Sequence, residues 1–285
     1  MKIIRGKNAV VTGAASGLGR AIALTLAREG ARLFLVDIDE TGLADTAHDA
    51  QQCGVEAFVH VCDLTDSEQI TTCPQAAVQR LGTVHILVNG AGRAYYGSTR
   101  RMPWRQWQSL MDLNLMAPIQ LTWALLPVLL NEDEAHVLNI CSAVGLMAGR
   151  KMAAYSTSKF GLVGFSEALW TDYGTGGLGV TALCPGFVDT NLFNAATSHA
   201  PDSPMRMPPK WLLLKPQAVA DKAVLAIKRN RRLVLCGGTV RLLWTIKRLS
   251  PWVFGRLVFV GRPHRKRTVN PADAEPNVAE PVGGR

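Results

Sequence analysis

The chain has 285 residues, of which 48% are hydrophobic and 19% are charged. This composition allows a sizeable buried core and excludes a globally disordered or collagen-like chain. The formal net charge is +9, but the positive charge is concentrated near the C-terminus, since the segment 228–267 holds 12 basic residues and no acidic one. The rest of the chain is slightly acidic. An acidic partner would therefore meet that segment and not the whole protein.

Strand-like apolar runs alternate with helix-length segments along the chain. The expected strands are 8–12, 32–37, 56–62, 85–89, 136–141, 180–184 and 233–236. The expected helices are 18–29, 42–53, 67–81, 104–130 with a bend at Pro118, and 154–173. This alternation predicts an α/β fold, a Rossmann-type doubly wound parallel sheet of seven strands in a single domain.

Three segments differ from this pattern. The domain is expected to span residues 1–239 and to include a proline-rich connection, 190–216, whose apolar content is typical of a substrate lid. Residues 240–262 form a basic, apolar extension. Residues 263–285 have few apolar side chains and are expected to be disordered.

The six cysteines show neither C-x-x-C spacing nor the Cys/His spacing of a zinc site. We therefore expect reduced thiols in a cytoplasmic protein, and no metal. No signal-peptide pattern is present at the N-terminus. We identify no run of about 18 uncharged apolar residues, so no membrane-spanning helix is expected.

A glycine-rich turn joins the first strand to the first helix. Gly13 permits a tight turn, Gly17 lets the backbone approach a pyrophosphate, and Gly19 permits close packing of helix on strand. The helix N-terminus offers unpaired N–H groups to phosphates. The turn, with Ser16 and Leu18 inside it, predicts a dinucleotide site, the alternative being a purely structural turn.

Asp37 ends the second strand, 18 residues past Gly19. A carboxylate at this distance accepts hydrogen bonds from the adenosine ribose and repels a 2′-phosphate. No basic residue follows it directly. The position therefore predicts NAD rather than NADP, unless Asp37 only caps the next turn.

Tyr155 and Lys159 are four residues apart in a predicted helix, so their side chains share one face. Ser142 follows the fifth strand, at the sheet edge where ligands bind, and Asn114 lies in the long helix before that strand. A phenol with a pKa of about 10 is a poor base near neutral pH. The Lys159 ammonium and a positive nicotinamide would lower the pKa of Tyr155 and let it exchange a proton with an alcohol.

The ordered motifs resemble those of the short-chain dehydrogenase/reductase family over about residues 5–192. They are Thr12-Gly13-x-x-x-Gly17-x-Gly19, Asn89-Gly90-Ala91-Gly92, Asn114, Ser142, Tyr155-x-x-x-Lys159 and Pro185-Gly186-x-x-x-Thr190. One departure is Gly90, where the family often has Asn. The resemblance implies a catalytic tetrad of Asn114, Ser142, Tyr155 and Lys159, in which Ser142 binds the substrate oxygen, Lys159 holds the nicotinamide ribose and Asn114 holds a water.

The resemblance also implies further cofactor contacts. Asp63, with its neighbour Leu64, should meet the adenine, and Thr190 should meet the nicotinamide carboxamide. The other positions expected at the cofactor are Asn89, Ala91, Gly92, Pro185, Gly186 and Val188. A strand cap at Asp63 and a simple turn at 89–92 are the structural alternatives.

The expected substrate pocket is apolar. Its lining is predicted to be Tyr95, Val144, Leu146, Phe187, Met207 and Trp211. This favours a lipophilic alcohol or its ketone or aldehyde, of the sterol, retinoid or long-chain type. Two alternatives stay open: a 3-oxoacyl thioester reductase whose basic tail docks an acidic carrier, and a nucleotide-sensing protein without catalysis.

The extension 240–262 combines Arg and Lys with Trp, Phe and Leu. That mixture suits a helix in a membrane interface, or equally a helix packed on its own domain or on a partner subunit. A nucleic-acid module is absent from the sequence, so no nucleic-acid partner is expected. The family resemblance implies a homodimer or homotetramer formed through the helices 104–130 and 154–173. The protein is expected in the cytoplasm, where it could also contact the inner face of a membrane peripherally.

Overall fold

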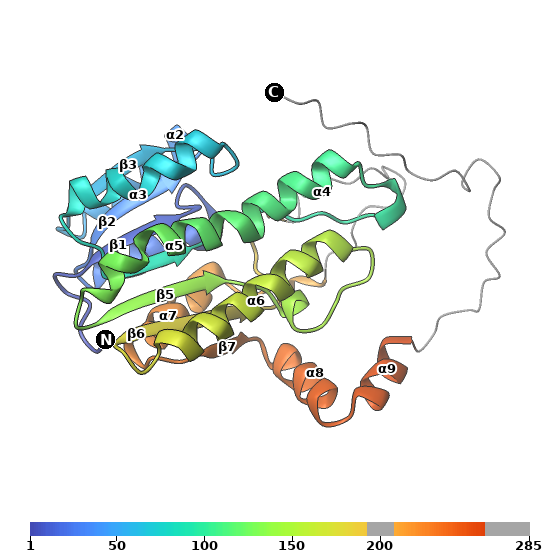
Figure 1. The fold of residues 1–285 in the computed structure, drawn as a ribbon. Helices are drawn as coiled ribbons and strands as arrows, with labels where there is room; N and C mark the ends of the chain where they lie inside the picture. The colour runs from blue at the N-terminus through green and yellow to red at the C-terminus, as the bar shows by residue number, and fades with distance from the viewer. Residues whose placement is uncertain (193–207, 260–285) are drawn as a thin grey trace.

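The computed structural model describes residues 1–192 and 208–259. Its centre is a parallel sheet of seven strands in the order β3-β2-β1-β4-β5-β6-β7 (Figure 1). The strands are β1 Asn8–Thr12, β2 Arg32–Asp37, β3 Ala57–Val61, β4 Ile86–Asn89, β5 Ala135–Ile140, β6 Leu178–Pro185 and β7 Leu233–Cys236. The predicted seven-stranded Rossmann-type sheet is confirmed.

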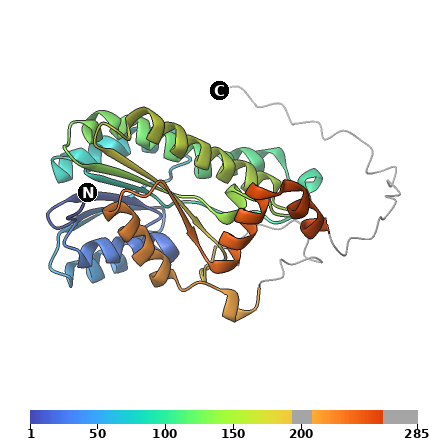
Figure 2. The same cartoon turned by 90° about the horizontal axis from the view of Figure 1, so that it is seen from below.

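Helices cover both faces of the sheet, as Figure 2 shows from below. One face carries α1 Gly17–Arg28, α2 Glu40–Gln51 and α7 Pro216–Lys228. The other carries α3 Ser67–Leu81, α5 Ala117–Leu130 and α6 Ala153–Tyr173. Each layer buries its own apolar cluster against the sheet, and β1 and β5 are buried along their whole length. Strands without an exposed face explain the continuous apolar runs in the sequence.

The long helix before β5 differs from the prediction at its bend. It consists of α4 Trp104–Met111, a π-helical turn at Asp112–Met116 and α5, so the irregularity precedes Pro118. Pro118 lies at the start of α5, where a missing N–H is tolerated. Hydrophobic periodicity does not predict the π-helical turn, because its one extra residue hardly changes the apolar pattern.

The sequence analysis identified no apolar run long enough to span a membrane, but one described helix is long and apolar enough. Trp104–Leu130 passes that test by length and composition, with a mean hydropathy of 1.6 in its best window. Leu121, Leu125 and Leu129 of this helix are buried against the sheet. That packing is typical of the core helix of a Rossmann fold.

Several boundaries differ from the expected ones by one or two residues. The largest shift among the helices is in α2, which begins at Glu40 because the Asp39 carboxylate accepts a hydrogen bond from Gly42 N and caps it. Among the strands, β6 starts two residues early, at Leu178, because its pairing with β5 begins at Ala135. These shifts move no candidate site residue out of its element.

Two helices follow β7 and extend past the carboxyl edge of the sheet (Figure 1). They are α8 Gly238–Leu249 and α9 Pro251–Phe259, separated near Pro251. Val240 and Trp244 of α8 pack against the domain, whereas Leu249 and Trp252 are 80% and 65% exposed. The tail 263–285 and part of the predicted lid, 193–207, lie outside the described residues.

Candidate active site

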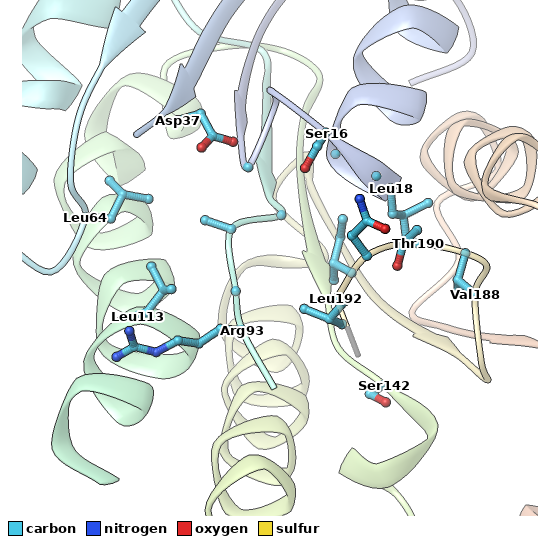
Figure 3. A pocket seen from close by; sticks show the side chains of 18 of the residues that line it. Ser16, Leu18, Asp37, Leu64, Arg93, Leu113, Ser142, Val188, Thr190 and Leu192 are labelled. Atoms are coloured by element: carbon cyan, nitrogen blue, oxygen red, sulfur yellow. The ribbon is translucent and has the colours of Figure 1, made fainter. Parts of the chain in front are cut away.

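A cavity of about 680 Å³ runs along the carboxyl ends of the strands. In Figure 3, Asp37 and Leu64 lie at one end of it and Ser142 at the other, with Ser16, Leu18, Val188 and Thr190 between them. The predicted residues in its lining are Gly13, Ser16, Gly17, Leu18, Gly19, Asp37, Asp63, Leu64, Ala91, Gly92, Ser142, Tyr155, Lys159, Pro185, Gly186, Val188 and Thr190. The fold therefore brings nearly all predicted cofactor residues to one elongated site.

The glycine-rich turn has the backbone that a phosphate cradle needs. Gly13 and Gly17 have φ of +69° and +56°, a region that side chains disfavour. A Cβ on Gly19 would overlap the carbonyl oxygen of Gly13. Ser16 precedes α1 without a side-chain cap, so the first N–H groups of the helix are left for a ligand. These residues fit the pyrophosphate of a dinucleotide.

Asp37 is held by the same turn. Its Oδ2 accepts a hydrogen bond from Ala15 N at 3.0 Å, and its Oδ1 accepts one from Ile38 N at 2.8 Å. These bonds fix the carboxylate at the end of the cavity, where an adenosine ribose would lie. Asp63 lies nearby and accepts hydrogen bonds from the backbone and hydroxyl of Thr65, so it also stabilises its own turn.

Asn89 is the one predicted cofactor residue that the cavity lining lacks. Its side chain is buried beneath the site and donates to Thr122 Oγ1 and Asn139 Oδ1 at 3.1 and 2.8 Å. It therefore joins β4 to β5 and α5. Gly90, the departure from the family pattern, packs so closely that a Cβ would meet Thr12 O at 2.5 Å. The closeness of β1 explains why a small residue is accommodated there.

Tyr155 and Lys159 extend from one face of α6 and are buried at the sheet edge. The Lys159 ammonium lies 5.9 Å from the centre of the Tyr155 ring and donates to Ile140 O at 2.8 Å. Burial raises the pKa of Tyr155 to about 12, although a hydrogen bond with Ser142 acts in the opposite direction. Burial likewise lowers the pKa of Lys159. In the protein alone the phenol is thus protonated at neutral pH.

Asn114 lies in the π-helical turn and is fully buried. Its side chain accepts from Arg93 N and donates to Arg93 O, both at 2.9 Å, and also donates to Ser158 Oγ. A Cβ on Gly92 would lie 3.0 Å from Asn114 Oδ1 and 3.6 Å from Lys159 Nζ. Asn114 therefore fixes the loop after β4 beside the Lys159 ammonium.

A second cavity, of about 1280 Å³, adjoins the first, and Ser142 and Gly186 line both. Its walls are mainly apolar and include the predicted Val144, Phe187 and Trp211. Residues from α8 and α9, among them Val240, Leu243 and Phe254, close one side. The C-terminal extension is thus a wall of this chamber.

Three predicted pocket residues are not in this lining. Tyr95 is buried below the chamber, and Tyr96 lines it instead, because the segment after β4 is irregular and side-chain direction cannot be read from its sequence. Leu146 packs into a neighbouring apolar cluster, where its carbonyl accepts a hydrogen bond from Lys247. Met207 lies outside the described residues.

Several residues that line the two cavities were not predicted from the sequence. Arg93 and Leu113 face the cofactor cavity, and Arg150 and Lys151 line the second chamber, which has no acidic residue among its described lining (Figure 3 for the first two). Arg93 directly follows the Asn89–Gly92 motif and Leu113 precedes Asn114, so closeness to a motif was the available signal. Arg150 and Lys151 carried no comparable pattern.

Comparison with known proteins identifies the class. The family model described as short chain dehydrogenase matches residues 7–201, so the chain belongs to that family. A Streptomyces violaceoruber protein named for ketoacyl reduction by the granaticin polyketide synthase is 39% identical over 193 residues, 67% of this chain and 71% of that protein. Rat estradiol 17-beta-dehydrogenase 11 is 29% identical over 254 residues, 88% of this chain and 82% of the relative.

Among solved structures, a short-chain dehydrogenase/reductase from Burkholderia phymatum in complex with NAD is similar throughout. The TM-score is 0.76 at 30% identity, and the match covers 87% of this chain and 96% of that one. The chain is therefore an oxidoreductase of this family, with a nicotinamide cofactor and a small-molecule substrate.

Proposed function

We propose that the protein interconverts a lipophilic alcohol and its ketone or aldehyde with NAD, using Tyr155 as acid and base. The observation that carries the proposal is the position of Ser142 on the boundary of both cavities, hydrogen-bonded to Tyr155. A substrate oxygen bound by the Ser142 hydroxyl therefore meets the Tyr155 phenol. Its carbon then faces the cofactor cavity.

The proton chemistry follows from the surroundings of Tyr155. In reduction, the protonated phenol donates to the carbonyl oxygen while Ser142 stabilises the charge developing there. In oxidation, Tyr155 takes the alcohol proton, and the Lys159 ammonium favours the phenolate. Bound NAD supplies the hydride acceptor or donor. Asn114 orders the loop beside Lys159, which supports its expected place in the tetrad.

NAD is favoured over NADP by Asp37. Its carboxylate is fixed by Ala15 N and Ile38 N, so it cannot turn away from a 2′-phosphate without breaking those bonds. Ile38 and Asp39 follow it, and neither can pair with a phosphate. The NAD complex of the Burkholderia phymatum relative is consistent with this choice.

The substrate class is inferred from the second chamber. Its volume and apolar walls suit a large hydrophobic molecule better than a short polar one. The rat relative, named for estradiol, supports a lipophilic substrate. The basic Arg150 and Lys151 favour a second candidate, 3-oxoacyl thioester reduction, to which the name of the Streptomyces relative also points.

A coenzyme-linked assay separates these candidates. The protein is incubated with NAD or NADP and a panel of sterols, retinoids and long-chain alcohols, and in the reverse direction with 3-oxoacyl thioesters. We expect NAD-dependent turnover of at least one lipophilic alcohol. Turnover of thioesters alone would favour the reductase, and NADH binding without any turnover would favour a nucleotide sensor.

We also propose that α8 and α9 contact the headgroup region of an anionic membrane. Four apolar side chains there are at least half exposed, namely Leu242, Leu249, Trp252 and Leu257. Arg248 and Arg256 stack on Trp244 and Trp252, at 5.4 and 3.8 Å from the ring centres. Basic residues beside exposed Trp and Leu suit a lipid interface. Because these helices also wall the chamber, an apolar substrate would enter directly from the lipid.

We propose further that the protein forms a homodimer or homotetramer through α4, α5 and α6. These helices expose Trp104, Trp123 and Phe160 by 52%, 73% and 39%. Large apolar side chains gathered on adjacent helices favour burial between subunits. Light scattering of the purified protein measures the assembly.

A further inference from the structure

Three side chains that bind soft metals converge between β3 and α3. His60 lies on β3, Cys62 follows the last residue of that strand, and Cys73 lies on α3. One ring nitrogen of His60 and the two sulfur atoms all lie within 4.8 Å of one another. The spacing of these residues in the sequence matches no recognised zinc motif, so the expectation of no metal site overlooked the cluster.

The fold itself produces this convergence. Residues two apart on an extended chain point to the same side, so His60 and Cys62 both face the layer that α3 forms. The two cysteines are buried, and their side chains are hydrogen-bonded to each other. His60 is half-buried and packs against the Phe34 ring, with 5.3 Å between the ring centres. One ligand therefore keeps a path to solvent.

We propose that His60, Cys62 and Cys73 bind one Zn²⁺ ion through two thiolates and one imidazole, with the fourth position open to water. Two Cys and one His are an established ligand set for zinc. With bonds of about 2.0 to 2.3 Å, ligand atoms in a tetrahedral site lie about 3.3 to 3.8 Å apart. The cluster needs a closure of at most about 1.5 Å, and we assign this movement to rotation of the half-buried His60. Binding releases the two thiol protons to solvent.

The local charge also suits a cation. The carboxylates of Asp63 and Asp66 lie close enough to Cys62 to act on it electrostatically. Cys62 also lines the end of the cofactor cavity that holds Asp37 and Asp63. An ion on the Cys62 sulfur therefore draws that wall toward α3. We expect Zn²⁺ to weaken NADH binding from this position, without contact to Tyr155 or Lys159.

Cobalt provides the test, because thiolate-bound Co²⁺ has a charge-transfer band that protein without thiolate ligation lacks. The reduced full-length protein is titrated with Co²⁺, and Zn²⁺ is then added to displace it. We expect one ion per chain and an intense band in the wild type. The band should be lost in Cys73→Ala and weakened at least tenfold in affinity in His60→Gln. Circular dichroism and NADH binding without metal verify that both variants fold.

Cys53→Ser is the matched control, because Cys53 is exposed and lies outside the cluster. This variant should keep the band, and Zn²⁺ should raise the Kd for NADH in it as in the wild type, but not in Cys73→Ala. Absence of the band in the wild type would overturn the proposal, as would its loss in Cys53→Ser or its persistence in Cys73→Ala. None of these readouts depends on catalytic turnover.

Discussion

Asp37 shows how a single side chain can set cofactor preference. Its carboxylate is fixed by the backbone of the glycine-rich turn and of residue 38, so it presents a charge at a constant position. Replacing it with Ser removes both the ribose acceptor and the repulsion of a 2′-phosphate. Hydrogen bonds to a charged group are worth about 1.5 to 3 kcal/mol.

We therefore expect Asp37→Ser to lower kcat/KM for NAD by about tenfold to a hundredfold and to raise kcat/KM for NADP, since about 1.4 kcal/mol corresponds to a factor of ten. Steady-state kinetics with both cofactors measure the change. Asp39→Ser is the control, because Asp39 caps α2 and is not in the described lining of the cavity. An unchanged preference in Asp37→Ser would contradict the assignment.

Residue positions could be predicted from sequence wherever backbone geometry imposes a residue type. Gly13 and Gly17 have the positive φ that the predicted turn needs, and Tyr155 and Lys159 lie on one face of α6 as the spacing predicts. Asn89 was predicted to contact the cofactor and Tyr95 the substrate, yet both side chains are buried below the cavities. Their side-chain directions depend on neighbours distant in sequence, such as Asn139, which no local pattern reveals.

At the scale of elements, close packing of α1 on β1 depends on Gly19. A Cβ there would overlap Gly13 O, so Gly19→Ala must push the helix away from the turn. We expect the Kd for NADH to rise at least tenfold and the free energy of unfolding to fall by about 1 to 3 kcal/mol, the usual cost of overpacking. Fluorescence titration and urea unfolding measure the two effects.

The control for this change is Gly164→Ala in α6, where an added Cβ would meet no atom within 4 Å. Alanine there should raise stability by up to about 1 kcal/mol through helix propensity and leave NADH binding unchanged. The steric account fails if Gly19→Ala binds NADH as tightly as Gly164→Ala does.

We expect His136 to make the central sheet sensitive to acid. It lies on β5, its Nε2 is 2.8 Å from Thr181 Oγ1 on β6, and burial lowers its pKa to about 3. The unfolded value is about 6.5, so the unfolded chain binds the proton first as the pH falls. The stabilising effect of neutral His136 is therefore complete above pH 6.5 and is lost as the pH falls toward 3.

Between pH 7.5 and 4.5 this histidine alone should lower the free energy of unfolding by about 2 to 3 kcal/mol, at about 1.4 kcal/mol per pH unit below 6.5. In His136→Gln the difference between the two pH values should shrink by that amount, whatever the overall stability of the variant. Urea unfolding at both pH values provides the measurement. An equal loss in wild type and variant would place the acid sensitivity elsewhere.

The seven strands and five of the helices were predictable because strands buried on both faces and amphipathic helices differ in period and length. Helix α7, Pro216–Lys228, was not among the expected elements. The π turn at Asp112–Met116 was not, since periodicity continues through it. The first residue of α2 is set by the Asp39 cap. Several polar residues nearby could equally cap a helix, so the sequence did not identify this one.

At the scale of the whole molecule, charge and apolar exposure meet on α8 and α9. If this face binds lipid, the protein should float with anionic vesicles at low salt. The double variant Leu249→Ser/Trp252→Ser should lose most of that binding, because both side chains are largely exposed and can enter the interface. Ile3→Ser is the control, since Ile3 is 69% exposed near the N-terminus, away from this face (Figure 1). Equal flotation of the double variant and the control would remove the membrane proposal.

The net charge of +9 first indicated a basic protein. Four basic residues and no acidic one lie on α8 and α9, which also wall the substrate chamber, while residues 1–237 hold 22 basic and 19 acidic residues. The concentration of basic residues toward the C-terminus could be obtained from the sequence, but the position of the two helices at the chamber could not. Leu243 and Phe254 line the same chamber as Val144, which lies about 100 positions earlier in the chain. Contacts between residues so far apart leave no local pattern in the sequence.

The central claim is that Tyr155 transfers the proton in an NAD-linked reaction. The most direct measurement compares wild type and Tyr155→Phe in single turnover with a lipophilic alcohol that the wild type oxidises, alongside NADH titration. Removing the phenol oxygen leaves the buried ring and the glycine-rich turn in place. We predict a loss of turnover of at least about a thousandfold, within the range for a general acid–base group, with the Kd for NADH changed less than about threefold. Retained turnover in Tyr155→Phe would contradict the account.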